Sequence, residues 1–118
     1  MRCARGSILD VIVDLRRGSP MYGRSIAVEL NDETGRTLYV PVGLAHGFVV
    51  LSDEADVIYR CSAYFDAATE AGIAWNDPDL AAPWPDMPVI VSARDQAAPR
   101  LVDVADELPF VYAPAPEA

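Results

Sequence analysis

The sequence contains no lysine, one histidine and two cysteines, and each shortage excludes a kind of protein or site. Cys3 and Cys61 are too few for a disulfide framework in a chain of 118 residues, so we expect both to be reduced thiols. The single histidine, His46, cannot supply the cluster of histidine and carboxylate ligands that a metal centre needs, and there is no Cys-x-x-Cys motif. We therefore expect neither a metal nor another cofactor.

Long apolar segments are also missing from the sequence. No apolar run approaches the roughly 20 residues that span a bilayer, and the N-terminus lacks the basic start and apolar stretch of a secretory signal. We expect a cytoplasmic protein with no membrane partner. The formal net charge of −9 repels phosphate backbones and argues against a nucleic-acid partner. All nine basic residues are arginine, which suits forked contacts to a diphosphate, although the same bias is typical of GC-rich genomes.

Short alternating segments predict an all-β domain with a single core. Residues 8–15 place Asp10 and Asp14 on one face and apolar side chains on the other, which is typical of a half-buried strand. Closely spaced strands with little helical periodicity indicate a sandwich or a barrel. We expect one domain over residues 1–108 and an extended or disordered tail over residues 109–118.

Turn signals predict the remaining elements. Between the last two strands, a segment punctuated by proline, glycine and alanine is expected to wrap the sheet irregularly. We expect one hairpin between residues 26–30 and 37–40 and a second between residues 47–51 and 56–63. A last short strand is expected at residues 89–91 and a helical turn at residues 103–108.

Three side chains could carry chemistry, and each also has an ordinary structural interpretation. His46 lies in a glycine-flanked turn, where a lone histidine is more often structural than catalytic. Tyr59 alternates with Val57 and Cys61, so it should face one side of its strand as a hydrogen-bonded core residue or as a general acid. Asp95 follows the last predicted strand, where an aspartate could orient a base but more commonly caps a turn.

Five motifs follow one another along the chain: RGSILDVIVDLRRGSP at residues 5–20, VPVGLAHGF at 40–48, VIYRC at 57–61, GIAWNDP at 72–78 and SARD at 92–95. Their wording, order and spacing resemble the dTDP-4-dehydrorhamnose 3,5-epimerase family over about residues 2–100. Several ordered motifs are far more specific than any one of them. The sequence departs from the family pattern at Arg60, Ala74 and Asn76, where the family has lysine, arginine and aspartate.

The resemblance implies a cupin-like β-barrel or jelly roll, an isomerase activity and a dTDP-4-keto-6-deoxy sugar as the substrate. It gives Tyr59 the place of the family's proton-donating tyrosine and Asp95 that of the aspartate that supports the catalytic base. His46 takes the place of a substrate-contacting histidine, and Glu70 and Arg94 take those of residues that bind the nucleotide sugar. We expect Tyr59 to point into the barrel, with His46 within reach of the same cavity.

The family's base is a histidine in a segment that lies upstream of the point where this chain begins, and no residue here matches it. We therefore expect a severely impaired epimerase, because acid–base assistance contributes about 10²–10⁴ in rate. The alternatives are a non-catalytic binding or interaction module, and a fragment of a longer epimerase whose start was assigned too late. Because the family's N-terminal strands are also unmatched, we expect an open barrel edge that a second copy of the chain covers, giving a homodimer.

Overall fold

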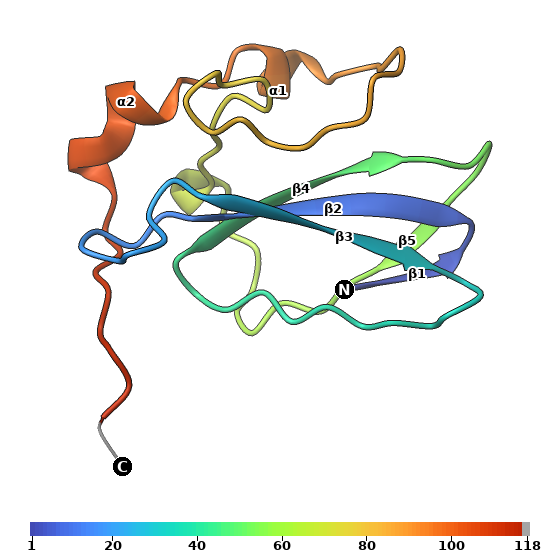
Figure 1. Cartoon of the computed structure of the whole chain (residues 1–118), viewed down its shortest axis with the longest axis horizontal. Coiled ribbons are helices and arrows are strands. Elements are labelled where there is room, and N and C mark those ends of the chain that lie inside the picture. Colours follow the sequence, from blue (N-terminus) through green and yellow to red (C-terminus); the bar gives the residue numbers. More distant parts are fainter. Residues whose placement is uncertain (117–118) are drawn as a thin grey trace.

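The computed structural model describes residues 1–116 and places their strands in two antiparallel sheets (Figure 1). The larger sheet has the order β3-β2-β4, in which β2 spans Ser7–Asp14, β3 spans Ser25–Asn31 and β4 spans Leu44–Val50. The smaller sheet pairs β1 (Arg2–Arg5) with β5 (Asp56–Ile58). The prediction of an all-β domain is confirmed.

The strand pairing of both predicted hairpins is wrong. Strand β3 pairs with one edge of β2, and β4 pairs with the other edge. Strand β5 pairs with β1, which the sequence did not predict. Residues 37–40 form no strand and contribute a single bridge, between Thr37 and Arg2. Turn residues mark where a strand ends, but the pairing of distant strands depends on which faces can be buried together.

Strand β2 is buried on both faces, which corrects the prediction of a half-buried strand. Asp10 has no exposed surface, and Asp14 is 6% exposed. Side chains alternate along a strand, so Ile8 and Ile12 share the face of Asp10, while Val11 lies on the opposite face. Both faces of β2 therefore carry apolar side chains, as expected for the central strand of a sheet that is covered on two sides.

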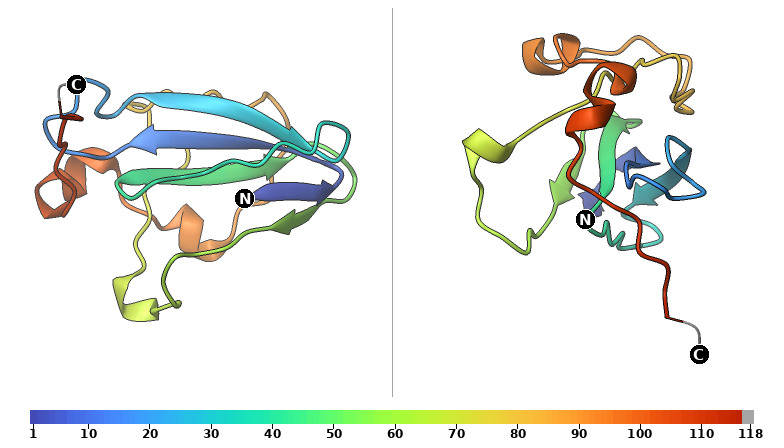
Figure 2. Two further views of the ribbon diagram at one scale, coloured as in Figure 1. Left: turned by 90° about the horizontal axis from the view of Figure 1, so that it is seen from below. Right: turned by 90° about the vertical axis from the view of Figure 1, so that its left-hand side faces the viewer.

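Each face of β2 contributes to a separate hydrophobic core. The first core lies between the two sheets and contains the buried side chains of Cys3, Ile8 and Leu30, with Val57 packed against them. The second core joins β2 to the C-terminal half of the chain, which lies along one side of the larger sheet in Figures 1 and 2. Its buried side chains are Val13, Leu15, Leu80 and Leu101.

The C-terminal half contains short helices joined by irregular segments. Helix α2 (Leu101–Val104) and the turn η2 (Ala105–Glu107) agree with the helical turn predicted at residues 103–108, whereas residues 89–91 form no strand. The buried carboxylate of Asp77 accepts hydrogen bonds from the backbone N–H of Leu101 at 2.7 Å and of Asp79 at 2.9 Å, which fixes the start of α2. The four helical elements are η1 (Ala67–Thr69), α1 (Ala93–Gln96), α2 (Leu101–Val104) and η2 (Ala105–Glu107).

The segment after η2 runs beside the loop that follows β2. The backbone N–H of Arg17 donates to the carbonyl of Phe110, and that of Tyr112 donates to the carbonyl of Arg17, both at 2.9 Å. The Arg16 guanidinium lies over the Tyr112 ring, 5.1 Å from its centroid. Residues 117 and 118 of the predicted tail lie outside the described residues.

The two sheets face each other across the first core without joining into a closed barrel. On the Asp10 side of the larger sheet, Ile12 lies opposite Ile26 and His46, and Asp10 lies opposite Phe48. Directly opposed residues share a face, so these side chains form one surface, which we call the open face. Ile26 is 57% exposed and Phe48 is 43% exposed, so this face is only partly covered. Within residues 1–116, no helix is long and apolar enough to cross a membrane.

Candidate functional site

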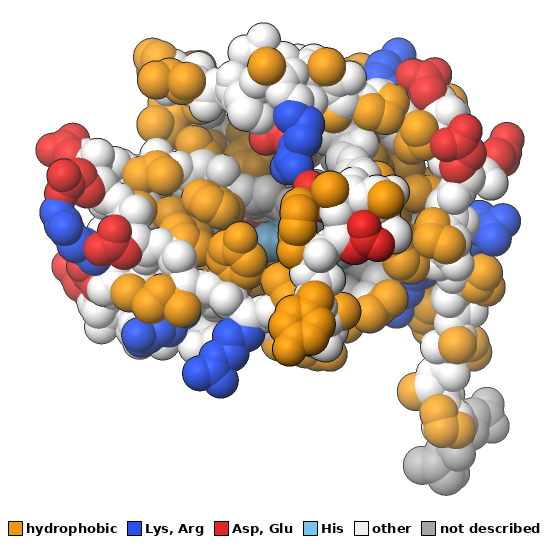
Figure 3. Space-filling view, turned by 180° about the vertical axis from the view of Figure 1, so that it is seen from behind, with side chains coloured by type: hydrophobic (Ala, Val, Ile, Leu, Met, Phe, Trp, Pro, Cys, Tyr) orange, Lys and Arg blue, Asp and Glu red, His pale blue; other side chains and the backbone are white. Residues whose placement is uncertain are grey.

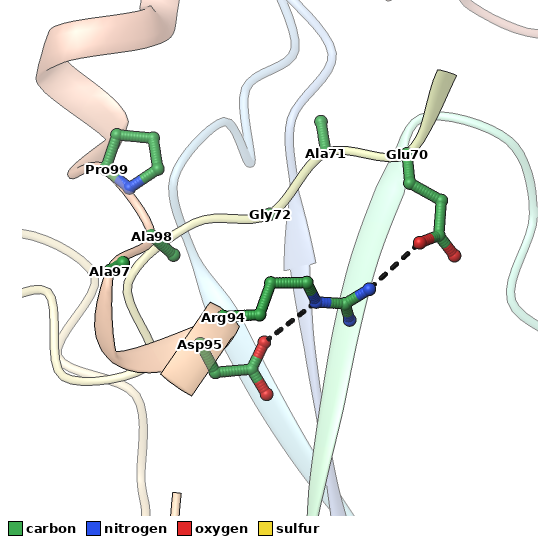
Figure 4. Close-up of a pocket in the computed structure, with 8 residues that line it drawn as sticks. All are labelled: Glu70, Ala71, Gly72, Arg94, Asp95, Ala97, Ala98 and Pro99. Carbon is green, nitrogen blue, oxygen red and sulfur yellow. Dashed lines mark hydrogen bonds and ion pairs between the residues drawn. The ribbon is translucent and has the colours of Figure 1, made fainter. Parts of the chain in front are cut away.

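Three of the predicted site residues, Glu70, Arg94 and Asp95, lie together in the C-terminal half (Figure 4). Arg94 Nη1 donates to Glu70 Oε2 at 2.9 Å, and Arg94 Nε lies 3.6 Å from Asp95 Oδ1. The other side chains around them are small, so a cavity of about 240 Å³ remains. The cavity is lined by Glu70, Ala71, Gly72, Arg94, Asp95, Ala97, Ala98 and Pro99.

Local backbone structure holds Arg94 and Asp95 at this cavity. Both belong to the single turn of α1, whose N-cap is Ser92. The Ser92 hydroxyl oxygen accepts a hydrogen bond from the Asp95 backbone N–H at 3.2 Å, which satisfies a donor that the start of a helix leaves unpaired. Both acidic side chains are thus directed at Arg94, one from α1 itself and one from the segment after η1 (Figure 4).

The ion pairs in the cavity are accessible to solvent. Arg94 is 76% exposed, and its partners Glu70 and Asp95 are 46% and 55% exposed. Exposed pairs of this kind typically contribute about 0–1 kcal/mol to stability. An incoming anion can therefore take over the Arg94 guanidinium at little cost in stability.

His46 is paired with Asp10, which was not among the predicted site residues. Its Nδ1 lies 3.2 Å from Oδ2 of Asp10, whose side chain is fully buried. The strand register explains the contact, because His46 lies opposite Ile12 and Asp10 is the next residue on that face of β2. The sequence did contain a signal for Asp10. It shares its strand face with the apolar residues Ile8 and Ile12, which indicates that this face is buried and not solvated.

Tyr59 follows β5 directly and is 64% exposed. The prediction of a phenol enclosed in a barrel is therefore wrong for this structure, and Cys61 is exposed as well. Val57, two residues earlier, does pack against the first core. The regular pairing of β5 ends at Ile58, so Tyr59 lies beyond the paired strand. Its side chain is therefore less covered than that of Val57.

A second carboxylate on β2 has a structural role. Asp14 accepts hydrogen bonds from Arg16 Nε at 3.0 Å, Arg16 Nη2 at 2.8 Å and the Ser19 hydroxyl at 2.6 Å. The Arg16 hydrogen bonds outweigh the effect of burial and, with help from Ser19, hold the pKa of Asp14 well below its usual range. The same contact raises the pKa of Arg16. Arg16 is thus engaged with Asp14 and Tyr112 and holds the loop after β2 to the C-terminal segment.

The described residues offer no group of three or more histidine, cysteine or acidic side chains placed to hold a metal ion. The polar groups that converge are instead Arg94 with two carboxylates at the cavity, and His46 with Asp10 on the open face. In the first set, the Arg94 guanidinium can form forked hydrogen bonds with an anionic group such as a phosphate only if that group displaces the two carboxylates. The second set suits proton transfer.

Comparison with solved structures identifies the class of fold. The chain superimposes on a dTDP-6-deoxy-D-glucose-3,5-epimerase from Legionella pneumophila, solved with dTDP-4-keto-L-rhamnose, with a TM-score of 0.91 and 39% identity, covering 96% of this chain and 61% of that one. It also matches a 3'-monoepimerase from Streptomyces bikiniensis, solved with dTDP-quinovose, with a TM-score of 0.84 and 39% identity over 89% of this chain and 54% of that one. The fold is accordingly the cupin-like β fold of these epimerases, with the barrel left open.

Sequence comparison identifies the family. The profile of the dTDP-4-dehydrorhamnose 3,5-epimerase family matches residues 1–103. A dTDP-4-dehydrorhamnose 3,5-epimerase from Mycobacterium tuberculosis is 47% identical over 105 residues, which are 86% of this chain and 52% of that protein. One from Sinorhizobium fredii is 38% identical over 112 residues, 94% of this chain and 57% of that protein. The chain belongs to the dTDP-4-dehydrorhamnose 3,5-epimerase family, and it spans between half and three-fifths of the length of these relatives.

Proposed function

We propose that this chain binds a dTDP-4-keto-6-deoxy sugar and catalyses proton exchange beside its ketone slowly. The observation that carries the proposal is the cavity at which Arg94 meets Glu70 and Asp95, in a chain that aligns with epimerases over most of its length. The Arg94 guanidinium is the cationic group in this cavity, and a dTDP sugar carries an anionic diphosphate. The exposed ion pairs can open to admit this group.

Epimerisation at C3 or C5 proceeds through an enolate. A base removes the acidic proton next to the C4 ketone, the electron pair moves toward the ketone oxygen, and an acid returns a proton to the opposite face. In our proposal Tyr59 supplies the proton, as the resemblance implies. Asp95 contacts Arg94 in this structure, so we assign it to the binding site and not to direct proton removal.

The rate is expected to be low, because the sequence has one histidine and the family's motif assigns that residue to substrate contact. Acid–base assistance contributes about 10²–10⁴ in rate, so we expect at most about a hundredth of a full-length relative's activity.

The second candidate function is a non-catalytic nucleotide-sugar-binding or interaction module. The exposure of Tyr59, at 64%, favours it, because a general acid works best in a site that excludes water. In either case we propose that a second copy of the chain covers an open edge of the larger sheet, whose outer strands are β3 and β4.

Calorimetric titration with dTDP tests the binding site. Replacing Arg94 by alanine should weaken binding about tenfold, because a hydrogen bond to a charged group contributes about 1.5–3 kcal/mol and the exposed position favours the lower end. Arg36→Ala is the matched control, since Arg36 is exposed on the loop after β3. If the Arg94→Ala protein and the parent bind dTDP with equal affinity, this cavity is not the binding site. If the parent does not bind dTDP at all, the proposed function is wrong.

A further inference from the structure

We propose that His46, held by the buried carboxylate of Asp10, is the base that removes the carbon-bound proton in this chain. The inference rests on the proposed function, because it needs a bound keto sugar. It goes beyond that function by assigning the proton-accepting atom, Nε2 of His46, and by giving Asp10 a positioning role.

The environment of Asp10 determines how its partner is protonated. The carboxylate is fully buried, and one of its oxygens, Oδ1, has no hydrogen-bond partner. Its other oxygen lies 3.2 Å from Nδ1 of His46, which is the hydrogen bond that the structure gives this side chain. A buried carboxylate that lacked even this partner would be strongly destabilising. When the Asp10 carboxylate is ionised it can only accept hydrogen bonds, so in that state the proton of this contact belongs to Nδ1.

The protonation of Nδ1 leaves Nε2 as the free nitrogen of the neutral ring. In a neutral imidazole one nitrogen donates and the other accepts, and the bond made by the first decides the state of the second. Asp10 thus selects the tautomer in which Nε2 carries a lone pair. It also stabilises the imidazolium that forms when Nε2 takes a proton, because its negative charge lies beside the ring in a buried setting.

The accessible part of the His46 ring lies on the open face. The side chain is 35% exposed while its partner Asp10 is wholly buried, so part of the ring is accessible, and Nε2 is the ring nitrogen that Asp10 does not contact. Figure 3 shows the only histidine of the chain in a recess between hydrophobic side chains. Phe48 and Ile26 belong to this surface. An apolar surround with one polar group is the usual lining of a small-molecule site.

The proposed step is balanced in atoms and charge. Nε2 of His46 takes the proton from the carbon next to the ketone, the carbon–hydrogen bond breaks, and its electron pair forms the carbon–carbon double bond of the enolate. The ketone oxygen gains the negative charge, and His46 becomes an imidazolium. Tyr59 then returns a proton to the same carbon, and the enolate electron pair re-forms the carbon–hydrogen bond and the ketone. Tyr59 regains a proton from solvent while Nε2 loses its own, so one exchange consumes no other reactant.

Deuterium exchange into dTDP-4-keto-6-deoxyglucose in D₂O tests the role of His46. The His46→Gln protein should exchange about 100-fold more slowly than the parent while still binding dTDP, because general-base assistance is lost. Asp53→Asn, at an exposed position, is a control that should exchange like the parent. Exchange by His46→Gln at the parental rate, or no exchange by a parent that binds dTDP, would overturn the inference but leave the binding proposal intact. A parent that fails to bind dTDP would overturn both.

The ring ¹⁵N chemical shifts of His46 test the role of Asp10 without any ligand. We expect the neutral ring of the parent to carry its proton on Nδ1. Asp10→Asn should shift the tautomer toward protonated Nε2, because the amide can donate to Nδ1, and exchange should fall by at least about tenfold. Circular dichroism checks that the variant folds. A parent ring with its proton on Nε2 would refute the role assigned to Asp10, and so would an Asp10→Asn protein that is folded and keeps the parental tautomer and exchange rate.

Discussion

Replacing Asp14 by asparagine should destabilise the protein by about 3 kcal/mol. Asp14 is 6% exposed, and it accepts hydrogen bonds from two nitrogens of the Arg16 side chain and from the Ser19 hydroxyl. Hydrogen bonds to charged groups contribute about 1.5–3 kcal/mol each, and breaking a buried ion pair costs about 3–5 kcal/mol. Arg16 is 32% exposed and asparagine keeps one acceptor oxygen, so we take the lower end of that range.

Urea unfolding at neutral pH measures this loss as a lower transition midpoint at unchanged slope. Asp53→Asn is the matched control, because it makes the same chemical change at an exposed position. The loop after β2 and the segment around Tyr112 should open first, since Arg16 joins them. A free energy of unfolding within about 0.5 kcal/mol of the parent's would refute the reasoning, because that is the range of ordinary surface substitutions.

The ion pair of Asp14 with Arg16 also determines how the free energy of unfolding depends on pH. The pKa of Asp14 is lower in the folded protein than in the unfolded chain, so its contribution is fully present above the unfolded value of about 3.9. It is lost as the pH falls below that value toward the depressed pKa of the folded state. The parent should therefore lose stability between neutral pH and pH 3 more steeply than the Asp14→Asn protein, and parallel curves in urea titrations at several pH values would contradict this.

Three further outcomes follow from the site and the fold. Tyr59→Phe should leave the unfolding midpoint nearly unchanged, since the side chain is 64% exposed, while deuterium exchange falls about 100-fold or more; unchanged exchange would exclude Tyr59 as the acid. Gly43→Ala should cost about 1–3 kcal/mol in urea unfolding, because Gly43 has φ of 94° and a Cβ would lie 2.5 Å from Arg16 Cγ; a neutral effect would show that this turn relaxes freely. Light scattering at micromolar concentration should give the mass of two chains, and a single-chain mass would contradict coverage of the open sheet edge by a second copy.

The sequence predicted the strands better than their partners. Alternation located β2 and β3 because it depends on neighbouring residues alone. Pairing depends on residues far apart: β5 returns to β1, about fifty residues earlier, through Cys3 and Val57 in the shared core. No local pattern encodes that contact, so the predicted hairpins were wrong.

In the candidate site too, features that depend on neighbouring residues could be predicted, whereas features that depend on distant contacts could not. The motif around Ser92 and Asp95 forms a helical turn locally, and the structure brings Arg94 of this turn to Glu70. That these two residues bind a nucleotide sugar stays a prediction. Asp10 was missed because an acidic residue in an alternating strand is normally solvated, and its burial depends on cover from the second sheet. Tyr59 was placed inside a barrel because alternation gives a direction but cannot tell whether another strand covers that side.

Solvent deuterium incorporation at C3 and C5 of dTDP-4-keto-6-deoxyglucose, followed by NMR with purified chain 1–118, tests the proposed function most directly. We expect exchange that is clearly faster than without protein, yet no more than about a hundredth of the rate of the full-length Mycobacterium tuberculosis relative under the same conditions. Exchange no faster than in buffer would contradict the proposed activity and favour a binding module. Exchange as fast as that of the relative would contradict the claim that this chain works without the family's base.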